Sequence, residues 1–177
     1  MSVEMKNNAE KELLRQLGTL SKMMIQHHAT NNLAQLVLHD LCSSSFNIDK
    51  AAYFVNNPDF KCLKGVAGYA RKEAYLPKRT IWEEAQDFTS HMDRAHFNNQ
   101  VRAYVTIHFE PTTGQQPVQP IAYELAQKLS MKNPQHHVWT LKHDNQGLLV
   151  YELDGQVPAV HEHLPDYLHY LGFCQIF

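Results

Sequence analysis

Residues 136–155, HHVWTLKHDNQGLLVYELDG, form the clearest strand–turn–strand pattern in this chain of 177 residues. In the first arm, Trp139 and Leu141 alternate with polar residues, and residues 148–153 repeat the alternation in the second arm. A period of two gives each strand two distinct faces. The four residues between the arms, Asp-Asn-Gln-Gly at 144–147, tolerate the positive φ values that a tight turn requires. The pattern therefore predicts a β-hairpin with an apolar face, which helices elsewhere in the chain must cover.

An amphipathic helix is predicted over residues 8–28, ahead of the alternating part of the chain. Its apolar positions recur at helical spacing on one stripe, namely Leu13, Leu17, Leu20 and Met24, which Leu14 and Met23 widen. The opposite face carries Lys, Glu, Arg and Gln. We expect the apolar stripe either to cap the domain or to pair with a second copy of the chain in a homodimer.

The other elements follow from apolar patterns and the breaks between them. Further helices are expected over residues 33–42, 80–99, 120–131 and 165–171, and strands over residues 50–55, 60–69 and 101–109. The longest of these helices starts at a capping box, Thr80 to Glu83. The last strand alternates cleanly, with Val101, Val105 and Phe109 on its core side.

The resulting order is α-α-β-β-α-β-α-β-β-α. Sequential hairpins with helices between them indicate an α+β fold, with a mostly antiparallel sheet covered by helices on one or both faces. The length suits one domain over residues 1–177, with an adequate core.

Charge and composition exclude several classes of protein. The chain has 16 Lys and Arg against 18 Asp and Glu, a net charge of −2, and no basic run, so we expect no nucleic-acid binding. It has no apolar run of membrane-spanning length and no signal segment, so we expect a cytoplasmic protein that does not associate with a membrane. Cys42, Cys62 and Cys174 are odd in number and widely spaced, which predicts buried free thiols.

The 12 histidines suggest a metal site. His91 and His96 are five positions apart on a predicted helix and point in different directions, whereas zinc pairs on helices use i, i+4 spacing. His161 and His163 share a face if their segment is extended, so they are the predicted metal or proton-transfer residues. Phosphate-loop, dinucleotide-binding and nucleophile-elbow motifs are absent, which leaves the cofactor open.

Two segments resemble the GAF domain, a small sensory fold that binds ligands. Residues 32–69 contain a helix, a strand, a turn and a second strand that ends in an alanine-glycine-aromatic run. Residues 138–171 contain a hairpin that leads into a short helix. The resemblance lies in topology and hydrophobic pattern, and covers less than half of the chain. It implies a GAF-like or PAS-like α+β domain with a flanking helix that pairs in dimers.

We therefore expect a non-catalytic module that binds a small molecule or has a regulatory role. Its pocket would lie between the sheet and the helix over residues 80–99, lined by Tyr53, Trp82, Tyr104 and Trp139. The alternative for these aromatic residues is ordinary core packing. Two other functions stay open. One is a His- or metal-dependent hydrolase that uses residues 161–163 or the polar row at Tyr104 and His108. The other is a scaffold protein that acts through the helix over residues 8–28.

Overall fold

A five-stranded antiparallel sheet forms the centre of the fold. The computed structural model describes residues 3–27, 32–57, 59–107 and 119–174. The strand order is β3-β2-β1-β5-β4, and every pairing is antiparallel. The strands are β1 Ile48–Asn57, β2 Cys62–Ala70, β3 Val105–Ile107, β4 Pro134–Thr140 and β5 Gln146–Leu153. The predicted α+β fold with a mostly antiparallel sheet is confirmed.

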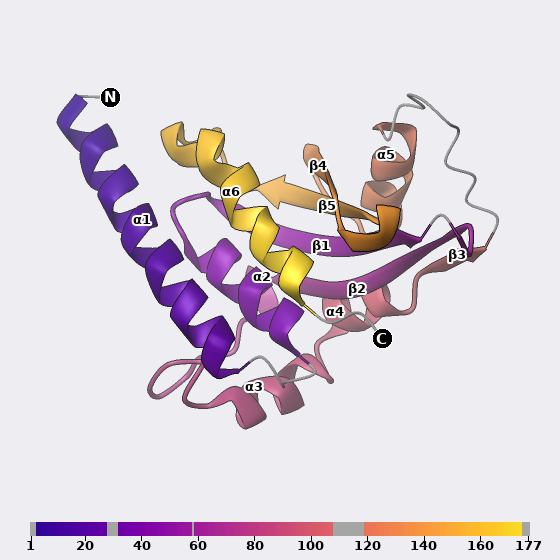
Figure 1. Cartoon of the computed structure of the whole chain (residues 1–177), viewed down its shortest axis with the longest axis horizontal. Coiled ribbons are helices and arrows are strands. Elements are labelled where there is room, and N and C mark those ends of the chain that lie inside the picture. Colours follow the sequence, from indigo (N-terminus) through magenta and orange to yellow (C-terminus); the bar gives the residue numbers. More distant parts are fainter. Residues whose placement is uncertain (1–2, 28–31, 58, 108–118, 175–177) are drawn as a thin grey trace.

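Helices cover both faces of this sheet (Figure 1). On one face lie α1 (Val3–Gln26), α2 (Leu33–Ser43) and α6 (Leu164–Leu168), with 3-10 turns at Ala159–His163 and His169–Phe173 on either side of α6. On the other face lie α4 (His96–Arg102) and α5 (Gln119–Lys128). The short helix α3 (Ala85–Met92) packs into the core of the first face.

Strand β1 is buried on both sides, as its sequence predicts. Ala51 and Tyr53 face the core beneath α1, α2 and α6, while Ala52 and Phe54 face the core beneath α4 and α5. All four residues are fully buried. A central strand between two layers of helices needs apolar side chains in both directions, which explains why its apolar run is continuous.

Helix α1 caps the domain. Leu13, Leu20 and Met24 are buried in the core of the first face, and the helix contacts α2 and the turn Ala159–His163. Leu14, which was expected to widen the buried stripe, is 67% exposed. It lies on the outer side of the helix. Pairing of α1 with a second copy stays a prediction.

The single helix predicted over residues 80–99 is wrong, because the chain forms two helices there. The capping box is present: Thr80 Oγ1 accepts a hydrogen bond from the Glu83 amide, and Glu83 accepts one from the Thr80 amide, each at 3.2 Å. It closes a turn that precedes α3. The helix then breaks at Ala95, whose backbone is extended. The buried Asn98 stabilises the break by donating to the Met92 carbonyl oxygen at 2.9 Å.

The strand predicted over residues 101–109 is also largely wrong. Val101 lies in the last turn of α4, and β3 covers only Val105–Ile107, with Val105 53% exposed. Positions 108 and 109, including His108 of the predicted polar row, lie outside the described residues. Val101 packs directly on β2, where a side-chain carbon at Gly65 would collide with its carbonyl oxygen and one at Gly68 would lie 2.7 Å from its Cγ2. Because the two glycines have no side chain, α4 can approach the sheet closely. Val101 could not take this position if it belonged to a strand.

The hairpin over residues 136–155 is present, but its turn is displaced. Positive φ values occur at His143 and Asp144, not at the Gln-Gly end of the predicted turn. Gly147 lies in β5 opposite Trp139, and a side-chain carbon at this position would collide with the indole ring. The glycine thus serves packing across the strands.

Candidate functional site

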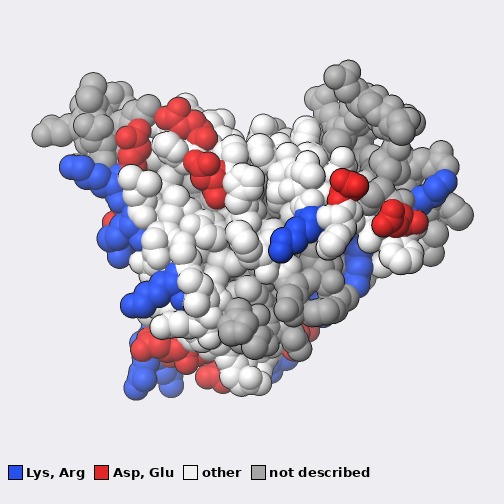
Figure 2. Space-filling view, in the orientation of Figure 1, with Lys and Arg blue, Asp and Glu red and all other residues white. Residues whose placement is uncertain are grey.

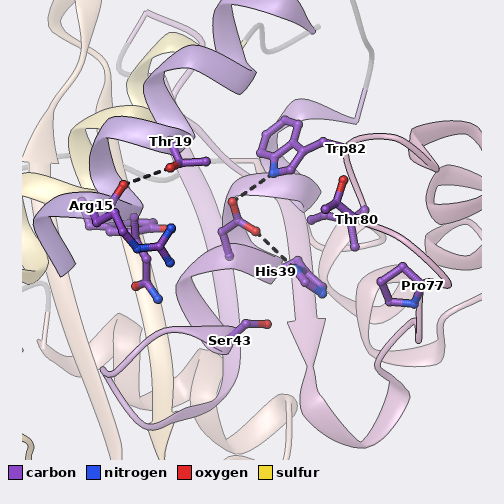
Figure 3. A pocket seen from close by; sticks show the side chains of 11 residues that line it. Arg15, Thr19, His39, Ser43, Pro77, Thr80 and Trp82 are labelled. Atoms are coloured by element: carbon purple, nitrogen blue, oxygen red, sulfur yellow. Dashed lines mark hydrogen bonds and ion pairs between the residues drawn. The ribbon is translucent and has the colours of Figure 1, made fainter. Parts of the chain in front are cut away.

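A cavity of about 300 Å³ opens where α1, α2 and the segment before α3 meet. Figure 3 shows Arg15 and Thr19 on α1 at one side and Pro77, Thr80 and Trp82 at the other. His39 and Ser43 from α2 lie between these two walls. We call this cavity the Asp40 pocket, after the carboxylate that also lines it. Its volume is at the lower end of the range for small-molecule sites.

Asp40 is held by hydrogen bonds on both carboxylate oxygens. Trp82 Nε1 donates to Oδ2 at 3.2 Å, and His39 Nδ1 lies 3.4 Å from Oδ1. The Asp40 side chain is 26% exposed and that of His39 is 14% exposed. The His39 ring also packs edge-on against Tyr69 and Phe88, with ring centroids 5.2 and 5.6 Å away. The carboxylate is therefore fixed in position while part of it faces the cavity.

The wall formed by α1 carries a cation and an amide. Arg15 donates to both carboxylate oxygens of Glu12, at 2.9 Å through Nε and 2.6 Å through its terminal nitrogen. Gln16 Oε1 is buried and has no hydrogen-bond partner among the residues that the structure describes. Such an amide oxygen is a vacant acceptor at the edge of the pocket.

The opposite wall is held in place by Glu84. Its carboxylate accepts from the Tyr75 hydroxyl at 2.7 Å and from the amides of Lys78 and Arg79 at 3.2 and 2.9 Å. The Tyr75 bond first, and then the two amides, lower the pKa of Glu84, and the same bond raises the pKa of Tyr75 to about 12. These contacts fix the segment that carries Pro77, Thr80 and Trp82.

Tyr167 of α6 contributes an aromatic ring to the pocket. Its side chain is almost completely buried. Burial raises its pKa well above the ordinary value, and the Asp40 carboxylate raises it further. The hydroxyl therefore stays neutral, and Tyr167 adds no charge to the site.

The structure does not bring the four predicted aromatic residues into one pocket. Tyr53 and Trp139 stack in the core of the first face, with ring centroids 5.5 Å apart. Tyr104 lies on the opposite face of the sheet, edge-on to Phe54 at 5.7 Å. Of the four residues, only Trp82 lines the Asp40 pocket.

The backbone conformation prevents the two predicted metal residues from sharing one face. Residues 159–163 form a 3-10 turn, so the extended geometry that would align His161 with His163 is not present. His161 Nε2 instead lies 2.9 Å from the Tyr151 hydroxyl. His163 lies beside Glu10 of α1 and Glu162, and the ligand atoms of these three residues are within 4.8 Å of one another.

A second cavity, of about 440 Å³, lies between α1 and the C-terminal 3-10 turn. It is lined by Met24, Ile25, Leu33 and Phe173, together with the hydroxyls of Ser21 and Tyr170. These two hydroxyls bond to each other at 2.7 Å. The polar groups of this cavity thus satisfy one another, whereas those of the Asp40 pocket include a carboxylate and a vacant amide oxygen.

The cysteines and the surface charges offer no comparable site among the described residues. Cys42 and Cys174 are buried, Cys62 is partly buried, and burial raises the pKa of the first two thiols. On the face shown in Figure 2, Lys and Arg side chains are spread among acidic ones and do not gather in one patch. In the part of the chain that the structure describes, each helix is too short or too polar to cross a membrane.

Comparison with known proteins adds no family: no family model, curated protein or solved structure matches the chain.

Of the residues that line this pocket, the sequence predicts only Trp82 as a ligand contact. The available signal was His39-Asp40, a polar pair inside the mostly apolar helix α2. Arg15, Gln16 and Tyr167 gave no signal, because α1 and α6 meet α2 only in the folded chain.

Proposed function

We propose that this protein is a small-ligand-binding module and that its ligand occupies the Asp40 pocket. The observation that carries the proposal is the convergence of α1, α2 and the segment before α3 on one cavity, with a fixed and partly exposed carboxylate in its wall. Convergent polar groups in a largely apolar pocket are the usual form of a small-molecule site.

Binding without catalysis is supported by how the polar groups are used. Asp40 joins α2 to Trp82, and Arg15 is paired with Glu12 on its own helix. Both side chains therefore have structural partners, which keep the shape of the pocket fixed before a ligand binds. A module of this kind agrees with the GAF-like pattern of residues 32–69 and 138–171.

A regulatory role follows from the position of the pocket. A ligand there would contact α1, α2 and the segment before α3 at once, and so stabilise the packing of α1 on the domain. Leu14 and Ile25 on the outer side of α1 are 67% and 74% exposed. Homodimer formation through this side of α1, in the cytoplasm, is part of the proposal.

Thermal unfolding with a library of small metabolites tests the proposal. Ligands should raise the melting temperature of the wild-type protein, and Thr19→Phe should abolish these shifts, because Thr19 is an exposed residue in the pocket wall. Lys11→Phe is the matched control, since Lys11 is exposed on the same helix outside the pocket. A library without any stabilising compound, or shifts that survive Thr19→Phe, would refute the proposal.

A metal-dependent enzyme is the second candidate, and the cluster of Glu10, Glu162 and His163 favours it. Two carboxylates and an imidazole are a donor set that zinc accepts. Native mass spectrometry during a zinc titration separates the two candidates. Zinc that binds the wild-type protein and the His161→Ala variant, but not the His163→Ala variant, would support the metal site. Zinc binding that is insensitive to His163→Ala would remove this candidate.

A further inference from the structure

The polar groups of the Asp40 pocket retain acceptor capacity for a ligand. Among the described residues, each oxygen of the Asp40 carboxylate has one contact, Oδ2 with Trp82 Nε1 at 3.2 Å and Oδ1 with His39 Nδ1 at 3.4 Å. A carboxylate oxygen accepts two hydrogen bonds, so each retains capacity for another donor. The vacant Oε1 of Gln16 adds a third acceptor atom, with no partner among the described residues.

The charges of the pocket also favour a ligand that donates hydrogen bonds. Among the described lining side chains, Arg15 and Asp40 carry formal charges at neutral pH. Arg15 makes two hydrogen bonds to the Glu12 carboxylate, at 2.9 and 2.6 Å, which neutralise its charge locally. The contact of Asp40 with His39 is long, at 3.4 Å, and its other partner, Trp82, is an uncharged donor. Among the described residues, no Lys or Arg pairs with Asp40, so its carboxylate is available to a cationic ligand.

The walls suit an apolar body next to that charge. The cavity is lined by the rings of Trp82 and Tyr167, together with Ile81 and Pro77. Aromatic rings attract cations as well as apolar groups, and ring plus carboxylate is a common combination for binding an ammonium group.

We infer that the Asp40 pocket binds a small organic cation, a primary amine on an apolar or aromatic body. The ammonium group donates to the Asp40 carboxylate and to Gln16 Oε1, and the body lies against Trp82, Tyr167 and Ile81. This inference rests on the proposed function and adds the chemical class of the ligand to it.

Matched probes test the charge preference by isothermal titration calorimetry. The amines are benzylamine, phenethylamine and tyramine; benzyl alcohol is the neutral counterpart of benzylamine and benzoate the anionic one. We expect at least one amine to bind about tenfold or more tightly than benzyl alcohol and benzoate, because its contact with Asp40 is charge-assisted.

Asp40→Asn should remove this preference, so that the amines bind the variant no more tightly than benzyl alcohol does. The asparagine retains an oxygen that can accept from Trp82 Nε1, and the thermal unfolding curve of the variant verifies its fold. Asp93→Asn is the control, because Asp93 is exposed and pairs with Arg102 outside the pocket. Its preference for amines should equal that of the wild-type protein.

The possible failures are distinguishable. Benzyl alcohol or benzoate binding as tightly as the amines, in a manner blocked by Thr19→Phe, would overturn the cation preference and leave the proposed function intact. An amine preference that persists in Asp40→Asn would equally overturn the inference. Failure of all five probes, together with a metabolite library that gives no thermal shift, would overturn both proposals.

Discussion

Trp82 Nε1 donates a hydrogen bond to Asp40 Oδ2 at 3.2 Å, and this bond links two segments that lie 42 positions apart in the chain. Asp40 belongs to α2, and Trp82 to the turn closed by the Thr80–Glu83 capping box. The bond places an aromatic ring beside a carboxylate in the wall of the same cavity. It therefore has two roles, because it connects the segment before α3 to the domain and orients the charge of the Asp40 pocket.

The first prediction concerns the strength of this bond. Trp82→Phe keeps an aromatic ring but removes the donor, and Asp40→Asn removes the charge of the acceptor. We expect a coupling free energy of about 1 kcal/mol between the two changes, since the bond involves a charged partner in a partly buried position. Urea unfolding of the two single variants and the double variant measures this coupling. Strictly additive effects would mean that the negative charge of Asp40 does not strengthen this bond.

A second prediction concerns Asn98, which is fully buried between α4 and β2. Its Oδ1 accepts from the Gly68 amide at 3.0 Å, and its Nδ2 donates to the Met92 carbonyl oxygen at 2.9 Å. Asn98→Ala would leave both backbone groups buried without this partner, so we expect a loss of about 3 kcal/mol in the free energy of unfolding. Asn99→Ala is the control: Asn99 is exposed and its side chain donates to the Asp93 carbonyl oxygen at 2.9 Å, so its loss should be below about 1 kcal/mol.

Glycine substitutions provide a third test, with opposite signs at two positions. Gly147→Ala places a methyl group against the indole of Trp139, and we expect a loss of about 2 kcal/mol. At Gly18, an exposed position in α1, nothing lies within 4 Å of the added carbon. Gly18→Ala should therefore stabilise the protein by about 0.5 to 1 kcal/mol through helix propensity. Thermal unfolding measures both, and a stable Gly147→Ala variant would contradict the packing of β4 on β5.

The fourth prediction is a pH dependence of stability. Burial lowers the pKa of His161 below its ordinary value of 6.5, and the neutral ring lies 2.9 Å from the Tyr151 hydroxyl. Burial also lowers the pKa of His137, to which His136 and His161 contribute as neighbouring charges. The unfolded chain binds these protons more readily than the folded one, so stability is complete above about pH 6.5 and falls as the pH drops below it.

His161→Gln should flatten this dependence between about pH 7 and 5, because it removes one such group and a neighbouring charge of His137. Chemical unfolding at a series of pH values measures the slope. A variant with the slope of the wild-type protein would show that His161 titrates alike in the folded and unfolded chain.

Much of the fold follows from local periodicity. Strand β1 and the hairpin of β4 and β5 carry continuous or alternating apolar patterns, and the structure forms them close to the predicted positions. Residues 101–109 alternate as well, yet Val101 lies in the last turn of a helix. Its position depends on Gly65 and Gly68, more than thirty residues earlier in the chain, and no local pattern contains that contact.

The Asp40 pocket could not be predicted from the sequence, for the same physical reason. Arg15, Asp40 and Trp82 each lie in a segment with an ordinary amphipathic pattern, and they meet only after α1 and the segment before α3 pack around α2. The four predicted aromatic residues do not line one pocket, because residues on one strand can face opposite sides of the sheet. Tyr53 and Phe54 show this directly, since Tyr104 packs on Phe54 and Trp139 on Tyr53.

The most direct test of the Asp40 pocket is the indole N–H signal of Trp82 in a ¹H–¹⁵N NMR spectrum. The chain has two tryptophans, and Trp139 lies away from the pocket against Tyr53, so it serves as an internal reference. During titration with a binding compound, we predict a saturable shift of the Trp82 signal and little change at Trp139. In Thr19→Phe, neither signal should shift. A stabilising compound that leaves the Trp82 signal unmoved, or moves it equally in Thr19→Phe, would contradict a ligand site at Asp40.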